Sequence, residues 1–160
     1  MPPPSSTEPA PPEQGRLREI AHGGLRGAIA AMAMTGMRAF TVDLGIVEQT
    51  PPEAIFKQRA RGLIRKVPRR RRRAAIELAH WGYGAAGGAV FAALPEGLRR
   101  RAWAGPIYGI ATWLGFEAAL APALGLSQAA KPRPLERTAL AADHLLYGFV
   151  LSETRRRPQA

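Results

Sequence analysis

The chain alternates between long stretches with almost no charge and short segments crowded with basic residues. Four weakly charged blocks lie at about residues 24–47, 74–94, 102–124 and 136–152. Their apolar residues do not alternate with polar ones as they would in a half-buried strand, and each block is as long as a helix. A helix needs about 20 largely apolar residues to cross the core of a bilayer. The pattern predicts an all-α fold, an integral membrane four-helix bundle with these blocks as its spans.

The two ends of the chain differ from the four blocks. Residues 1–15 hold six of the fifteen prolines, and such a segment has too little apolar surface to offset the entropy of ordering. It also lacks the basic start and short apolar run of a secretory signal peptide. We expect a disordered tail over residues 1–15, a membrane domain over 16–154 and a basic C-terminal tail over 155–160.

Glycine is frequent inside the blocks and recurs there at a spacing of four residues. Inside a membrane, small residues at this spacing let two helix backbones approach closely. The same G-x-x-x-G faces also predict self-association into a homo-oligomer. The glycines that we expect at helix contacts are Gly84, Gly88, Gly105, Gly109 and Gly148.

The chain has a formal net charge of +11, and its most basic part lies between the first two blocks. Thr50-Pro-Pro-Glu53 is a plausible helix start, and apolar residues then recur at helical spacing among the basic ones. This favours an amphipathic helix that lies on anionic lipid headgroups. Five consecutive arginines also suit nucleic acid, but no aromatic residue stands among them to stack on bases, so no nucleic acid is expected. The predicted headgroup contacts are Lys57, Arg59, Arg65, Arg69, Arg70, Arg71, Arg72 and Arg73.

The distribution of Lys and Arg between the loops predicts an orientation in the membrane. With four spans, the first and third loops share one side, and they hold thirteen basic residues against eight on the other side. Short loops rich in Lys and Arg remain in the cytoplasm. The counts favour a multi-pass protein with a cytoplasmic polybasic loop and both termini outside, by a modest margin over the opposite arrangement.

Several ionisable residues interrupt the apolar blocks at similar depths. Such residues usually face protein or water and have a partner. At a rise of about 1.5 Å per residue, they fall on one level, nearer to the polybasic side. We therefore expect one buried polar layer, in which Arg38 pairs with a carboxylate. Its members are Arg38, Asp43, Glu77, His80, Glu117, Asp143 and His144.

The same residues allow an alternative interpretation as a metal site. Glu77-x-x-His80 has the i, i+3 spacing of di-metal helical bundles, and a soluble bundle would bind a metal through Glu77, His80, Glu117 and His144. Those bundles need a second E-x-x-H, which this chain lacks. The absence of cysteine excludes disulfides, thiolate zinc sites and cysteine nucleophiles. No catalytic motif is present either, so we expect no metal, no cofactor and no enzymatic activity.

Several short glycine-based motifs occur inside the blocks. They are His80-Trp-Gly-Tyr-Gly-Ala-Ala-Gly-Gly-Ala, Gly105-Pro-Ile-Tyr-Gly with Trp113 beyond it, Pro122-Ala-Leu-Gly125 and His144-Leu-Leu-Tyr-Gly. These motifs resemble those of the YagU-like family of small bacterial inner-membrane proteins. The resemblance covers about residues 21–153 and implies a multi-spanning helical protein of the bacterial plasma membrane, without an agreed activity or site residues. A structural, stress-related or permeation-related role fits this description.

Overall fold

A computed structural model describes residues 12–45, 66–123 and 134–153. Every regular element in these ranges is helical, as the hydrophobic pattern predicts, and none of the described residues forms a strand. The elements in chain order are α1 (Pro12–Asp43), the 3-10 turn η1 (Arg69–Arg71), α4 (Arg72–Ala93), α5 (Glu96–Arg99), α6 (Ala104–Gly115), the π-helical turn η2 (Phe116–Leu120), α7 (Ala121–Ala123) and α8 (Pro134–Glu153).

The long helices lie where the four weakly charged blocks predict them. The main difference is at the start of α1, which begins at Pro12, inside the segment that we expected to be disordered. Proline suits the first helical turn, and Glu13 beside it interacts favourably with the positive end of the helix dipole. The third block forms α6, η2 and α7 in succession. The predicted amphipathic helix, with Lys57, Arg59 and Arg65, lies outside the described residues, as does the tail 155–160.

Within the described ranges, no helix has both the length and the run of apolar residues that a membrane crossing requires. The described residues are thus shown to be helical by their elements alone. The four membrane spans stay a prediction.

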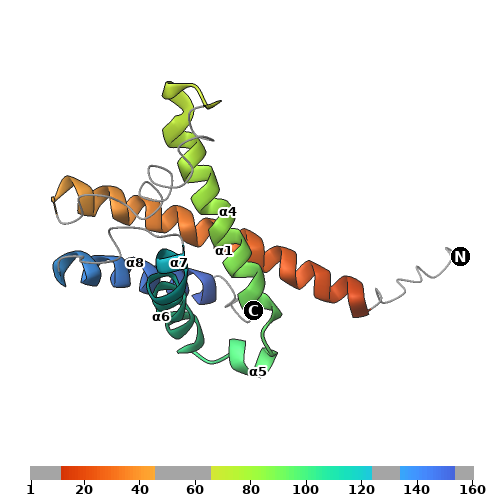
Figure 1. Cartoon of the computed structure of the whole chain (residues 1–160). Coiled ribbons are helices and arrows are strands. Elements are labelled where there is room, and N and C mark those ends of the chain that lie inside the picture. Colours follow the sequence, from red (N-terminus) through yellow and green to blue (C-terminus); the bar gives the residue numbers. More distant parts are fainter. Residues whose placement is uncertain (1–11, 46–65, 124–133, 154–160) are drawn as a thin grey trace, which may run out of the picture.

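The helices form two antiparallel hairpins that pack against each other. α4 packs on α1, α6 packs on α8, and α1 and α8 join the two pairs. In Figure 1, α1 and α8 run side by side, while α4 and α6 cross them. The backbones of α4 and α6 make few close approaches to each other. This leaves room between these two helices for the site described below.

The predicted packing glycines lie where the helices of each hairpin cross. A Cβ atom on Gly88 would meet Gly23 and Gly27 of α1, and one on Gly148 would meet the backbone of Gly105 on α6. Because each neighbour is backbone, no side chain can move aside, and only glycine allows these approaches. Gly84 and Gly109 lie in similar contacts, against α1 and α8. These glycine faces therefore pack within one chain, which removes them as the surfaces for self-association.

The buried core is small and changes character along its length. Its apolar part combines alanines with a few large side chains. Toward the end of α1 the core turns polar, because Arg38 and Asp143 are only 5% and 3% exposed. The apolar members of this core are Ala30, Met34, Phe91, Ala104, Tyr147 and Leu151.

Candidate functional site

A cavity of about 500 Å³ lies between α4 and α6, and α1 and α8 form its floor. We call it the α4/α6 cavity. Tyr83 and Val90 of α4 and Tyr108 and Trp113 of α6 form its walls, and Tyr147 of α8 lies on its floor. Cavities of this size, with mainly apolar and aromatic linings and a few polar groups, are typical of small-molecule sites.

Two tyrosines on other helices hold α4 at the edge of the cavity. The Tyr108 hydroxyl donates to the carbonyl oxygen of Gly87 at 2.7 Å, and the Tyr108 ring lies 5.1 Å from that of Phe91 between centroids. The Tyr147 hydroxyl donates to the carbonyl oxygen of Gly84, also at 2.7 Å. These contacts tie α6 and α8 to the same face of α4.

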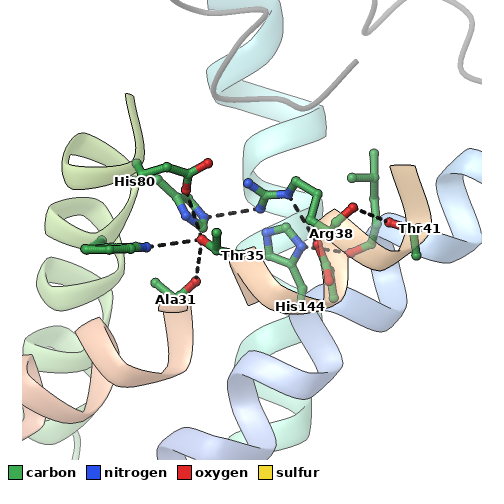
Figure 2. Close-up of polar contacts among 10 residues, drawn as sticks. Ala31, Thr35, Arg38, Thr41, His80 and His144 are labelled. Carbon is green, nitrogen blue, oxygen red and sulfur yellow. Dashed lines mark hydrogen bonds and ion pairs between the residues drawn. The ribbon is translucent and has the colours of Figure 1, made fainter. Parts of the chain in front are cut away.

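The other end of the cavity is polar and centres on Arg38. Its Nε lies 3.5 Å from Oδ2 of Asp143, and its Nη2 donates to Nε2 of His80 at 3.3 Å. Figure 2 shows the rings of His80 and His144 beside the Arg38 guanidinium. Nδ1 of His144 donates to the carbonyl oxygen of Leu140 at 2.8 Å. α1, α4 and α8 each contribute a charged or titratable group here.

A second polar contact joins α1 to α4 beside this cluster. The Thr35 hydroxyl accepts a hydrogen bond from Nε1 of Trp81 at 3.1 Å and lies 3.0 Å from Oε2 of Glu77. It also lies 3.2 Å from the carbonyl oxygen of Ala31, so its single proton serves either oxygen in turn (Figure 2). Glu77 is therefore engaged with Thr35 rather than with Arg38.

The predicted polar layer is assembled only in part. Arg38, His80, Asp143 and His144 lie together at the polar end of the cavity. Glu117 lines the same cavity, but its carboxylate accepts from Nη2 of Arg137 at 2.9 Å.

Asp43 does not belong to the layer. It is the last residue of α1 and is exposed, since the helix ends there beyond the packed region. Equal depth along a helix places a residue at the right level, but it does not turn the side chain inward. Asp43 therefore corrects the sequence prediction.

Buried polar atoms without a hydrogen-bond partner are concentrated in this region. Among the described residues, they are Nε of Arg38, Nδ1 of His80, Nε1 of Trp113 and Oδ1 of Asp143. An unpaired buried donor costs about 1–3 kcal/mol. His80 and Trp113 line the cavity from opposite walls, but these two nitrogens have almost no accessible surface and therefore do not face its interior.

The structure does not assemble the alternative metal site. No three candidate ligands come together in the described part of the chain. Of the four proposed ligands, Glu77 is hydrogen-bonded to Thr35 and Glu117 is paired with Arg137. A metal would have to displace both contacts.

Sequence reasoning missed Thr35 and Tyr108 in this site. His80-Trp-Gly-Tyr83-Gly84 and His144-Leu-Leu-Tyr147-Gly148 each place a tyrosine three residues after a histidine, yet the two tyrosines differ. Tyr147 is buried and hydrogen-bonded to α4, whereas Tyr83 is 52% exposed. A motif places both tyrosines on equivalent helix faces, but the neighbouring helices decide which face is covered.

Neither a protein-family model, nor a curated protein, nor a solved structure matches this chain. The resemblance to the YagU-like family therefore stays a prediction, and the function is argued from the geometry of the chain itself.

Proposed function

We propose that this protein is a membrane-embedded four-helix bundle that binds a small apolar molecule in the α4/α6 cavity. One observation carries the proposal. Many large apolar side chains face outward, whereas the interior is built from glycines, alanines and an ion pair with only a few large apolar side chains. The role is binding or permeation, without catalysis.

The outward apolar side chains occur on each of the four long helices. Among them are Ile29 of α1, Val90 of α4, Ile107 of α6 and Phe149 of α8, each of them about half exposed. Soluble monomers rarely leave so much apolar area in contact with water. In lipid, the outer face needs no cover, and packing depends on close contacts between small residues inside. The distribution of residue sizes therefore favours a lipid environment.

The ends of α4 also fit a membrane of ordinary thickness. α4 has 22 residues, which corresponds to about 33 Å, close to the roughly 30 Å of a hydrocarbon core. Arg69–Arg73 lie at its start, the last two of them in its first turn, and Arg99–Arg101 follow it. The mean hydropathy of α4 includes His80 and those glycines that face the interior of the bundle. In a membrane, lipid would contact only the outer face of the helix.

The arginines before α4 supply a surface for anionic headgroups. Arg70 and Arg73 line a shallow depression together with Leu78 and Trp81. Guanidinium groups pair with phosphate, and tryptophan favours the interface between headgroups and acyl chains. We therefore propose a bacterial plasma membrane location, with this polybasic end on the cytoplasmic face.

The charges around the cavity favour a neutral ligand. Arg38 is paired with Asp143, and Glu117 is paired with Arg137. Neither an anion nor a cation would find an unbalanced counter-charge there. The apolar walls would then supply most of the binding free energy.

Single cysteines test the membrane proposal cleanly because the chain has none of its own. Ile107→Cys places a thiol on the outward face of the first turn of α6, and Gly97→Cys places one in α5, at the end of the bundle. Both positions are exposed in the structure. In native membranes opened to both sides, a charged maleimide should label Gly97→Cys and leave Ile107→Cys unlabelled until the protein is denatured. Equal labelling rates at the two positions would mean that α6 faces water, and the proposal would fail.

Ligand binding is tested with an uncharged aromatic probe, 2-methylnaphthalene, in mild detergent. Ala86→Trp fills the cavity from an exposed position of its α4 wall, and binding should weaken at least tenfold. Ala93→Trp adds the same bulk to α4 outside the cavity and should bind as the wild type does. Unchanged binding by Ala86→Trp would exclude this cavity as the site.

A further inference from the structure

The hydrogen-bond donors in the lining of the α4/α6 cavity are largely used by the protein itself. The hydroxyl groups of Tyr108 and Tyr147 donate to carbonyl oxygens of α4. The Thr112 hydroxyl donates to the carbonyl oxygen of Tyr108 at 2.8 Å. Nδ1 of His80 and Nε1 of Trp113 have almost no accessible surface, so a molecule in the cavity does not reach them. None of these five residues offers a free proton to a ligand.

His144 presents an acceptor that is open to the cavity. Its Nδ1 lies 2.8 Å from the carbonyl oxygen of Leu140, which can only accept, so Nδ1 carries the proton of the neutral ring and Nε2 a lone pair. The ring lies beside the Arg38 guanidinium, whose positive charge disfavours an imidazolium (Figure 2). Nε2 has no hydrogen-bond partner among the described residues, and it is not one of the buried unpartnered atoms, so it is accessible. Since His144 lines the cavity, a ligand there has to bring a donor for this nitrogen or leave it unpaired.

Arg38 supplies a donor at the same end of the cavity. Its Nε is paired with Asp143 and its Nη2 donates to His80, whereas Nη1 has no hydrogen-bond partner in the described part of the chain. Nη1 is not one of the buried unpartnered atoms either, so it is also accessible. A hydroxyl group is the smallest uncharged group that both donates, as Nε2 of His144 requires, and accepts, as Nη1 of Arg38 requires.

The remaining lining determines the shape and charge of the ligand. Tyr83, Tyr108 and Phe116 present aromatic rings from both walls, which suits a flat ring that packs against them. The paired charges described above disfavour a carboxylate, a phosphate or an amine. A flat, uncharged ring that carries a hydroxyl group meets these conditions.

From these contacts we infer that the ligand belongs to the phenol class and that its hydroxyl group donates to Nε2 of His144. The inference rests on the proposed function, because it names the ligand class of the same cavity. It concerns binding alone, and the phenol keeps its proton.

2-Naphthol and 2-methylnaphthalene form a matched pair of probes, because a hydroxyl group takes the place of a methyl group of similar size. Titration calorimetry of the full chain in mild detergent at neutral pH, where a phenol is uncharged, measures both dissociation constants, and a protein-free titration corrects for partition into the detergent. We expect 2-naphthol to bind about fivefold more tightly, which is the gain from one typical hydrogen bond. 2-Methoxynaphthalene keeps the oxygen but lacks the proton, and should bind no more tightly than 2-methylnaphthalene.

Two histidine variants assign this preference to one nitrogen. His144→Phe keeps an aromatic ring and removes Nε2, so 2-naphthol and 2-methylnaphthalene should bind to it equally well. His22→Phe makes the same change at an exposed position of α1 outside the cavity and should keep the fivefold preference. Circular dichroism shows whether each variant keeps its helices, and the 2-methylnaphthalene constant shows whether the cavity is intact. The comparison of the three probes on the wild-type protein does not depend on either variant.

The outcomes separate this inference from the proposed function. Equal binding of 2-naphthol and 2-methylnaphthalene to the wild type would overturn the phenol inference and leave an apolar ligand site intact. The same holds if 2-methoxynaphthalene binds as tightly as 2-naphthol, or if His144→Phe keeps the full preference. Failure of all three probes to bind would overturn both proposals.

Discussion

Two glycines of α4 test whether close backbone contact holds the first hairpin together. At Gly88, a Cβ atom would lie 2.7 Å from Cα and 2.8 Å from N of Gly27, and would also meet the carbonyl oxygen of Gly23. At Gly82, six residues earlier in the same helix, nothing lies within 4 Å of such an atom. Gly88→Ala and Gly82→Ala are therefore the same chemical change, made against the backbone of α1 in the first case and in open space in the second.

The structure determines the size of the difference. Alanine is favoured over glycine inside a helix by about 1 kcal/mol, and this gain is common to both variants. Ordinary contact starts at 3.4 Å, so α1 has to withdraw from Gly88→Ala by about 0.7 Å to clear Cα of Gly27 and by more to clear the carbonyl oxygen of Gly23. Overpacking of this kind costs about 1–3 kcal/mol. We expect Gly82→Ala to be about 1 kcal/mol more stable than the wild type and Gly88→Ala to be about 1–3 kcal/mol less stable than Gly82→Ala.

The assay is unfolding by sodium dodecyl sulfate in mixed micelles, followed by far-ultraviolet circular dichroism. Midpoints and slopes of both variants and of the wild type give the differences in free energy of unfolding. If Gly88→Ala proves as stable as Gly82→Ala, the close contact between α1 and α4 does not exist, and the arrangement of the first hairpin is refuted.

Three further changes address the site and the orientation. Tyr147→Phe removes the buried hydroxyl that donates to Gly84 and should lower the free energy of unfolding by about 1 kcal/mol in the same assay. Asp143→Asn leaves the Arg38 guanidinium buried without its counter-charge and should cost about 3–5 kcal/mol, much of which the double variant Arg38→Met, Asp143→Leu should recover. Replacement of Arg69–Arg73 by glutamine removes five basic residues and so the whole excess of thirteen over eight on that side; it should invert part of the population, as measured by one-sided maleimide labelling of a cysteine at the other end of the bundle.

Each of these predictions has its own control. Tyr83→Phe removes an exposed hydroxyl and should leave stability unchanged, so an equal loss in both tyrosine variants would contradict the role of the buried hydroxyl. Asp43→Asn changes an exposed carboxylate and should be neutral. A double variant as unstable as Asp143→Asn alone would show that the pair itself, rather than the unpaired charge, dominates. Unchanged labelling after replacement of the arginines would exclude them as the determinant of orientation.

The positions of the helices and of their contact faces follow from the sequence, because both depend on local spacing. A run without charge marks a helix, and glycines four residues apart mark the side where a second backbone fits, as at Gly84 and Gly88. The depth of an ionisable residue also follows from its distance to the end of the helix. This is why Arg38 and Asp143, more than a hundred residues apart, were expected at one level and do meet.

Only the tertiary structure decided which of these groups face each other and where space remains. Glu77 and Glu117 have the expected depth but take Thr35 and Arg137 as partners, because small rotations of each helix choose among several polar neighbours. The α4/α6 cavity exists because the two hairpins join through α1 and α8, which keeps α4 and α6 apart except near Tyr108. The way in which these helices cross depends on contacts between residues far apart in the chain. It therefore cannot be predicted from the spacing of residues within one helix.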